Sequence, residues 1–275
     1  MGGIDRHPLH PSRAQQNANR RPTGTNAAQR TIVAMTDLLL PGLSIVLPCH
    51  DEADNVVQAV REARHAAQRS ARDHEILVVD DGSSDGTGRI AAEIVRTEPG
   101  VRLVVHSVNR GYGAALRSGI LAASMPWILL TDADLQFDLD QVEGFLPAAE
   151  SADLVVGWRR PRADPFGRRV NAAAWNWLVR RTFALPVHDV DCAFKLVRRD
   201  LARDLNLRSD GAMISTELIV KALARGARLE ELGVSHRPRM HGEQSGASPR
   251  VVVRAFVELE RLRRALRAPH TPASA

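Results

Sequence analysis

The sequence predicts an α/β fold in which helices cover both faces of a mostly parallel central sheet. Short, continuously apolar segments recur along the chain, and amphipathic stretches separate them. Strands buried on both faces read as continuous apolar runs, and intervening helices are the usual connections of a parallel sheet. Polar side chains gather where the apolar segments end, and that edge is where sheets of this kind bind ligands.

Each apolar segment predicts a strand, and the amphipathic stretch after it predicts a helix. The expected strands are 43–48, 75–80, 101–107, 127–131 and 153–158. The expected helices after the first three strands are 54–68, 87–98 and 111–123. A chain of 275 residues without internal repeats fits one domain of ordinary size with appendages.

We expect the domain itself over residues 39–246. Residues 1–38 are expected to be a disordered tail, because their beginning is rich in Arg, Asn, Gln and Pro without apolar periodicity. No run approaches the ~20 apolar residues of a membrane-spanning helix, and no signal peptide is expected. The two cysteines, Cys49 and Cys192, offer neither a disulfide framework nor a zinc site. A reduced, cytoplasmic protein is therefore expected.

The net charge of +5 is distributed unevenly. Five arginines and one aspartate give residues 1–30 a charge of +4, and six arginines and two glutamates give residues 247–275 the same. Seven arginines and one aspartate give residues 158–181 a charge of +6. The remaining body is acidic. The basic segments predict an anionic partner, although a coding bias toward arginine would also raise the charge.

Two carboxylates, Asp132 and Asp134, directly follow the apolar strand 127–131. At the abrupt end of a buried strand, both can turn toward one hard cation, with Gln136 as a further oxygen ligand. Mg²⁺ and Mn²⁺ favour such ligands and commonly bridge a carboxylate to substrate phosphates. The structural alternative is a helix N-cap, where aspartate is also favoured.

The turn after the second predicted strand begins with Asp80 and Asp81. Carboxylates at the end of a buried strand need partners, and a nucleobase and ribose would supply donors. A turn capped by Asp and Ser is the alternative. The stretch from Gly111 to Ala114 lacks the third glycine of a dinucleotide fingerprint, so we interpret it as a tight turn with close helix packing.

Taken together, these motifs resemble family 2 glycosyltransferases with the GT-A fold, and most of all the polyprenyl-phosphate (dolichol-phosphate type) mannosyl and glucosyl transferases. The resemblance covers roughly residues 43–245. The matching segments, in order, are Leu47–Glu52, Val79–Ser83, Asp132–Gln136, Val156–Arg159, Asp189–Leu196, Thr216–Glu217 and Arg237–Glu243.

The resemblance implies a metal-dependent, inverting transfer of a hexose from a nucleotide sugar. Metal ligation would fall to Asp132, Asp134 and Gln136. It implies catalytic roles for both aspartates and for Arg159 and Arg239, which would neutralise the diphosphate or the acceptor phosphate. The residues implied around the nucleotide sugar are Pro48, His50, Glu52, Val79, Asp81, Asp132, Ala133, Asp134, Arg159 and Arg239.

The acceptor contacts depart from the family pattern. A Ser-Arg pair is often found in the helix after the Gly-x-Arg motif, whereas this chain has Ala172-Ala173. A lysine often follows Gly-Glu-Ser, whereas this chain reads Gly242-Glu243-Gln244-Ser245. We therefore assign the acceptor phosphate to Arg168, Arg169 and Lys195. A phosphate acceptor needs orientation rather than a base; for a hydroxyl acceptor, Asp191 or Glu217 would serve as the base.

Two basic amphipathic segments predict contact with a membrane surface. The helix expected at 165–185 places Val170, Ala174, Trp177 and Leu178 on one face, with arginine pairs at both ends. The basic helix and tail at 247–275 show a similar mixture. Packing of both helices against the domain core is the alternative.

The favoured interpretation is transfer of a hexose to a polyprenyl phosphate by a peripheral enzyme on the cytoplasmic membrane face, with no nucleic acid as partner. GDP-mannose is the first donor expected and UDP-glucose the second, with Mg²⁺ or Mn²⁺ as cofactor. A family 2 enzyme acting on a hydroxyl acceptor is the first alternative. A basic membrane- or nucleic-acid-binding module without catalysis is the second, but it leaves the strand-end carboxylates unexplained.

Overall fold

The structure is a computed structural model that describes residue 2 and residues 38–160, 166–239 and 249–267. Within the last two ranges, the side chains of 166–172 and 249–253 are not described. Residues Leu39–Ala275 form one compact unit. The expected tail at 1–38 lies almost wholly outside the described residues, so its disorder stays a prediction.

Seven strands form one sheet in the order β3-β2-β1-β4-β6-β5-β7. All five predicted strands are present, and β6 and β7 are additional. The strands are β1 (Leu40–Cys49), β2 (Ala71–Asp81), β3 (Val101–His106), β4 (Trp127–Leu130), β5 (Leu154–Arg159), β6 (Lys195–Arg198) and β7 (Leu229–Val234).

The first four strands run parallel, as predicted, and this brings their carboxyl ends to one edge. In the register, Cys49 lies beside Asp80, and Asp81 lies beside His106. Strand β4 pairs with β1 on its other side and ends at Leu130, opposite Val46. The inserted strand β6 is antiparallel to both β4 and β5, so the sheet is mixed in its second half.

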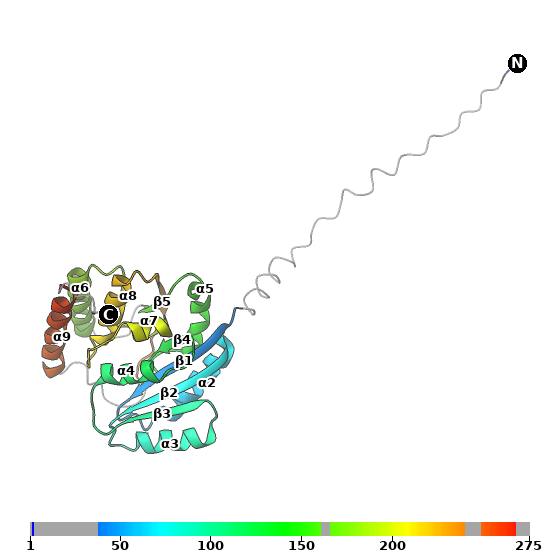
Figure 1. Cartoon of the computed structure of the whole chain (residues 1–275), viewed down its shortest axis with the longest axis horizontal. Helices are drawn as coiled ribbons and strands as arrows, with labels where there is room; N and C mark the ends of the chain where they lie inside the picture. Colours follow the sequence, from blue (N-terminus) through cyan, green and yellow to red (C-terminus); the bar gives the residue numbers. More distant parts are fainter. Residues whose placement is uncertain (1, 3–37, 161–165, 240–248, 268–275) are drawn as a thin grey trace, which may run out of the picture. The chain divides into compact units, whose positions relative to one another are not determined.

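Helices connect the strands and cover the sheet (Figure 1). Predicted helices 54–68, 87–98 and 111–123 correspond closely to α2, α3 and α4. The helical elements are α2 (Val56–Ser70), α3 (Thr87–Thr97), α4 (Tyr112–Ala122), the 3-10 helix η1 (Leu139–Phe145), α5 (Leu146–Ala149), α6 (Phe166–Phe183), α7 (Arg199–Asp204), α8 (Ile214–Ala224) and α9 (Pro249–Arg267).

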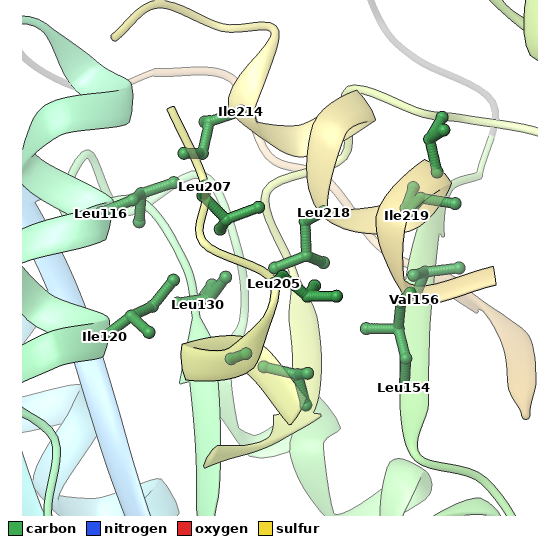
Figure 2. Packing of buried hydrophobic residues seen from close by; sticks show 14 of the residues in the cluster. Leu116, Ile120, Leu130, Leu154, Val156, Leu205, Leu207, Ile214, Leu218 and Ile219 are labelled. Carbon is green, nitrogen blue, oxygen red and sulfur yellow. The ribbon is translucent and has the colours of Figure 1, made fainter. Parts of the chain in front are cut away.

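A large apolar core holds α4 and α8 on the sheet. Figure 2 shows Leu116 and Ile120 of α4 near Leu130 of β4, and Leu218 of α8 on the side toward β5. These side chains are at most a few per cent exposed. Full burial of a leucine or isoleucine contributes about 1.5–3 kcal/mol each. The core therefore fixes the helices whose first turns border the carboxyl edge of the sheet.

Helices α6 and α9 lie next to each other at one end of the molecule (Figure 1). The ring of Trp175 on α6 packs edge-on against that of Phe256 on α9, with centroids 5.3 Å apart. Val179 of α6 is fully buried, whereas Trp177 is 67% exposed. The face that the sequence predicts for the membrane is thus turned outward at Trp177, and another face packs on the core. Among the described residues, no helix combines the length and apolar character needed to cross a membrane.

Candidate active site

The strand-end carboxylates Asp132 and Asp134 lie at the carboxyl edge of the sheet, directly after β4. The Oδ1 atom of Asp132 is buried and has no hydrogen-bond partner in the part of the chain that the structure describes. Burial raises the pKa of the Asp132 carboxyl, against the lowering effect of a hydrogen bond with the Tyr112 side chain and of the positive charge of Arg159. A buried carboxylate oxygen without a partner is costly, so this site favours a cation or a proton.

Asp134 shares that environment. Burial and the negative charge of Asp132 raise the pKa of its carboxyl to about 7. The Oδ1 atom of Asp134 accepts a hydrogen bond from the backbone N–H of Gln136 at 3.1 Å. Leu135 between them has a φ of 61°, a left-handed conformation that turns the chain sharply after the strand. The chain therefore turns away directly after the two aspartates, whose carboxylates act on each other at the end of β4.

These residues fit a divalent cation. Two buried carboxylates with raised pKa values, one of them carrying an unpaired oxygen, gain most from a hard positive charge. Gln136 uses its side-chain Nε2 to donate to the Arg237 carbonyl oxygen at 3.1 Å, which holds its amide in place. No cluster of three or more His, Cys, Asp or Glu side chains in the described residues is arranged for metal binding. Further ligands would therefore be the Gln136 amide oxygen, water or substrate phosphate.

The carboxylate of Glu52 and the guanidinium of Arg239 close one side of this group. Arg239 forms an ion pair with Glu52, and its Nη1 lies 3.8 Å from Oδ2 of Asp134. Asn55 also donates to Glu52, with Nδ2 and Oε2 2.5 Å apart. Arg239, which is predicted to face the diphosphate, therefore lies beside the predicted metal ligands. Residues after Arg239 in the Arg237–Glu243 motif lie outside the described residues.

The loops after β1 and β2 are tied together. Backbone N–H groups of Asp51 and Glu52 donate to the hydroxyls of Ser83 and Thr87 at 3.0 and 2.9 Å. In return, the N–H of Ser84 donates to Asp51 at 2.8 Å. His50 is exposed beside Asp51, and Pro48 is partly exposed at the end of β1. These hydrogen bonds therefore join the two segments that are predicted to contact the nucleotide.

Asp81 is placed at this edge, but its carboxylate already has protein partners. It accepts hydrogen bonds from the backbone N–H groups of Arg110 and Gly111, at 2.9 and 2.7 Å, and contacts Nδ1 of His106 at 2.6 Å. Its side chain is only 4% exposed. Asp81 thus holds the turn between β3 and α4, and a nucleotide contact by Asp81 stays a prediction.

Two of the predicted contacts are limited by burial. The side chain of Val79 is fully buried in the apolar core, so a nucleotide contact by Val79 would come from its backbone and stays a prediction. Lys195 is also buried, and its ammonium donates to the backbone carbonyls of Val190 and Cys192. Burial lowers the pKa of this amine. Its structural role is to fix the loop before β6, which leaves it unavailable to an exposed lipid phosphate.

Arg159 at the end of β5 forms a two-point ion pair with Asp189. Its Nε and Nη2 lie 2.6 and 2.7 Å from the two carboxylate oxygens. Burial would raise the pKa of Asp189, but this pairing lowers it. The charge of Arg159 also acts on Asp132. Arg159 is thus near the predicted metal ligands, already oriented by Asp189.

The two candidate bases occupy different environments. Burial and the charge of Asp189 raise the pKa of the Asp191 carboxyl to about 6. The Glu217 carboxylate instead accepts hydrogen bonds from two backbone N–H groups and pairs with Lys221 at 2.6 Å. Although burial opposes ionisation, these donors lower the pKa of Glu217. The donors around Glu217 therefore favour Asp191 as the candidate base, and both assignments stay predictions.

Other predicted site residues have simpler outcomes. Ala133 is buried between the two aspartates. Arg168 and Arg169 fall on the first turn of α6, where the structure describes the helix but not their side chains. Tyr112 was missed as a partner of Asp132. The signal was present, because the one tyrosine of the chain lies between two glycines at the start of a helix.

The chain matches the model of the family described as Glycosyl transferase family 2 over residues 44–205. A protein of Mycobacterium tuberculosis, described as an uncharacterized glycosyltransferase, is 35% identical over 205 residues, which are 73% of this chain and 88% of that protein. The dodecaprenyl-phosphate galacturonate synthase of Rhizobium johnstonii is 30% identical over 73% of this chain and 60% of its own length. The undecaprenyl-phosphate 4-deoxy-4-formamido-L-arabinose transferase of Edwardsiella ictaluri is 29% identical over 73% of this chain and 62% of its own. The chain thus spans less than two thirds of the last two.

Solved structures share the fold. Glucosyl-3-phosphoglycerate synthase of Mycobacterium tuberculosis with bound UDP superimposes with a TM-score of 0.62 at 18% identity, covering 89% of this chain and 86% of that one. Mannosyl-3-phosphoglycerate synthase of Rubrobacter xylanophilus gives 0.61 at 22% identity, covering 90% and 80%. The predicted GT-A fold is confirmed. With the family match over 44–205 and the mycobacterial relative, the chain belongs to glycosyl transferase family 2 and is a glycosyltransferase.

Proposed function

We propose that this enzyme transfers a sugar from a nucleoside diphosphate sugar to a polyprenyl phosphate. The single observation that carries the proposal is the buried pair Asp132 and Asp134 with an unpaired carboxylate oxygen, at the edge where β1, β2 and β4 end. A divalent cation held by these carboxylates would supply the positive charge that a diphosphate requires. The prenyl-phosphate substrates in the names of the two relatives support the acceptor class.

Bound Mg²⁺ or Mn²⁺ would supply charge stabilisation for the departing nucleoside diphosphate. Asp132 and Asp134 would hold it, with Gln136 beside them. Arg239, held by Glu52, presents a positive charge on the same side. Arg159 is fixed by Asp189 and contributes a further positive charge near Asp132.

The acceptor phosphate needs no base. A phosphate monoester has a second pKa of about 6, so it is largely dianionic near neutral pH and attacks the anomeric carbon directly. Mannose from GDP-mannose remains our first proposal for the donor, and glucose from UDP-glucose the second. Solved relatives of the fold crystallised with Mn²⁺ and UDP-glucose support a divalent metal in general.

We place the enzyme on the cytoplasmic face of the membrane. The outward Trp177 of α6 and the exposed Phe256 and Val257 of α9 give this end of the molecule an apolar surface. Arg180 and Arg181, exposed on α6, add the positive charge that anionic lipid headgroups attract.

The test mixes the full chain with a water-soluble short-chain polyprenyl phosphate, Mg²⁺ or Mn²⁺, and GDP-mannose or UDP-glucose in turn. The expected result is one glycolipid product that requires the metal and disappears with EDTA. A parallel reaction supplies phosphoglycerate or a glycan in place of the polyprenyl phosphate. Formation of a glycoside there, with no glycolipid from either donor, would overturn the acceptor proposal.

A hydroxyl acceptor is the second candidate, and Asp191 favours it. A carboxyl with a pKa near 6 is suited to accept a proton near neutral pH. In that case the transfer rate rises with pH through about 6 and is lost in Asp191→Asn. For a phosphate acceptor, Asp191→Asn causes a partial loss only.

A further inference from the structure

The carboxylate of Glu217 accepts hydrogen bonds from the loop that precedes α8. At the first turn of α8, its two oxygens accept hydrogen bonds from the backbone N–H of Arg208 at 2.9 and 3.0 Å and from that of Ser209 at 2.7 Å. Lys221, one turn further along α8, supplies the counter-charge. The side chain is only 3% exposed, so the loop 208–211 is fixed to α8 by a buried ionic anchor.

That loop packs directly on the glycine turn between β3 and α4. The N–H of Gly113 donates to the carbonyl of Asp210 at 2.8 Å. A Cβ added at Gly113 would lie 2.4 Å from the carbonyl oxygen of Ser209, and this contact excludes any larger residue there. Arg117 of α4 reinforces the junction, with hydrogen bonds of 2.6 Å to Ser209 and to Asp210.

The same glycine turn is held on its other side by Asp81, which accepts the N–H groups of Arg110 and Gly111. A Cβ at Gly111 would lie 2.5 Å from the Asp210 carbonyl oxygen. The turn is therefore clamped between β2 and the loop 208–211. Tyr112, at its centre, has its side chain near the Asp132 carboxylate and acts to lower the pKa of that carboxyl.

We propose that Glu217 is a positioning residue for the metal site: through loop 208–211 and the glycine turn 111–113, it fixes Tyr112 and so orients Asp132. The proposal rests on the proposed function in that Asp132 is the metal ligand. Removal of a side chain that orients a metal ligand typically lowers metal affinity or activity 10–100-fold.

The first test compares Glu217→Gln with Glu217→Ala, using Glu93→Gln as the matched control. Glu93 also pairs with a cation on its own helix, Arg96 of α3, and among the described residues its side chain has no hydrogen bond to a loop. Glutamine keeps one acceptor for the loop, so we expect kcat to fall about 10-fold with glutamine and about 100-fold with alanine. The pH profile of kcat/KM keeps its shape, and amide hydrogen exchange rises in both 208–213 and 110–114.

Equal inactivity of the glutamine and alanine variants, with hydrogen exchange at 110–114 unchanged, would overturn the proposal and restore Glu217 as a base. Loss of the acidic limb of the pH profile in Glu217→Gln would do the same. The exchange measurement needs no turnover, so it tests the positioning role even where the wild-type chain gives no glycolipid.

The second test isolates the last contact with Tyr112→Phe, which removes one hydroxyl. We titrate Mn²⁺ in the presence of GDP or UDP, whichever the wild-type chain binds. The expected result is a 10–100-fold weaker Mn²⁺ affinity, with nucleotide binding in EDTA unchanged. An unchanged Mn²⁺ affinity would show that Tyr112 does not orient Asp132 for metal binding and would overturn the proposal. Should Glu217→Ala fail to fold, Glu217→Gln carries the test of Glu217, and Tyr112→Phe tests the contact with Asp132.

Discussion

At the residue scale, the site depends on buried charges that balance one another. Asp132 and Asp134 repel each other, and Arg239 with Glu52 and Arg159 with Asp189 surround them as pairs. Each arginine is already hydrogen-bonded to a carboxylate, so its direction is set before substrate arrives. Preorganised charge of this kind costs no reorganisation during the reaction.

We predict that Asp132→Ala lowers transfer by about 10²–10³-fold or more and removes metal-dependent nucleotide binding. The reason is that the carboxylate with the unpaired oxygen is lost. The measurement is steady-state transfer together with calorimetric titration of nucleotide with and without Mn²⁺. Asp200→Ala, on the exposed first turn of α7, is the control and should match the wild type. Unchanged turnover in Asp132→Ala would refute the metal assignment.

At the element scale, one buried carboxylate joins three strands and a helix end. Glu75 of β2 accepts hydrogen bonds from Ser44 of β1 at 2.7 Å, from Arg102 of β3 at 2.6 Å, and from the backbone and hydroxyl of Ser124 after α4. Burial disfavours its charge, yet these donors lower the pKa of Glu75 below its usual value. Glu75 thus stabilises the opposite edge of the sheet from the active site.

We predict that Glu75→Gln lowers the free energy of unfolding by about 2 kcal/mol at pH 7. A carboxyl whose folded pKa is lowered stabilises the fold above its unfolded pKa of 4.5, and this stabilisation is lost as pH falls through the folded value. The difference between variant and wild type should therefore shrink at low pH. Urea unfolding at pH 7 and at about pH 3 measures it.

The control for that experiment is Glu98→Gln. Glu98 pairs with Arg64 at the surface, where such pairs contribute about 0–1 kcal/mol. A difference for Glu75→Gln that stays constant across the pH range would contradict the assignment of the effect to its ionised form.

At the scale of the whole molecule, helix α9 joins the proposed membrane surface to the loop 208–211. Arg254 and Glu258 of α9 are paired at 3.0 Å, and the Glu258 carboxylate accepts the backbone N–H of Gly211 at 3.2 Å. The loop 208–211 is therefore held by α8 on one side and by α9 on the other. Docking of α9 on the body thus supports the glycine turn beside Asp132.

We predict that the chain binds vesicles containing anionic phospholipid. Trp177→Ser should weaken this binding about 10-fold, because the variant loses an exposed aromatic side chain that would insert into the lipid headgroup region. Added salt should weaken binding further. Sedimentation with vesicles measures both effects. Leu121→Ser is the matched control, since Leu121 of α4 is 65% exposed and Trp177 is 67% exposed. Equal loss in both variants would show that α6 is not the contact surface.

Local sequence pattern was sufficient for the first half of the fold. The five continuous apolar runs predicted β1 to β5, and the glycines at 111 and 113 predicted the close packing that Ser209 and Asp210 provide. Strands β6 and β7 were not predicted, because Lys195–Arg198 and Leu229–Val234 mix charged and apolar residues. Lys195 shows why: its stem is buried in the sheet while its ammonium finds carbonyl oxygens that no local pattern reveals.

The sequence by itself determined the strand-end carboxylates, since a charge that directly follows a buried strand must lie at the edge of the sheet. Only the tertiary structure decided which of those charges remain available. Asp81 is already hydrogen-bonded to the turn at 110–111 and Arg159 is oriented by Asp189, whereas Asp132 keeps an oxygen that has no hydrogen-bond partner among the described residues. The physical reason is that hydrogen-bond partners come from segments distant in the chain, and their availability depends on packing rather than on residue type.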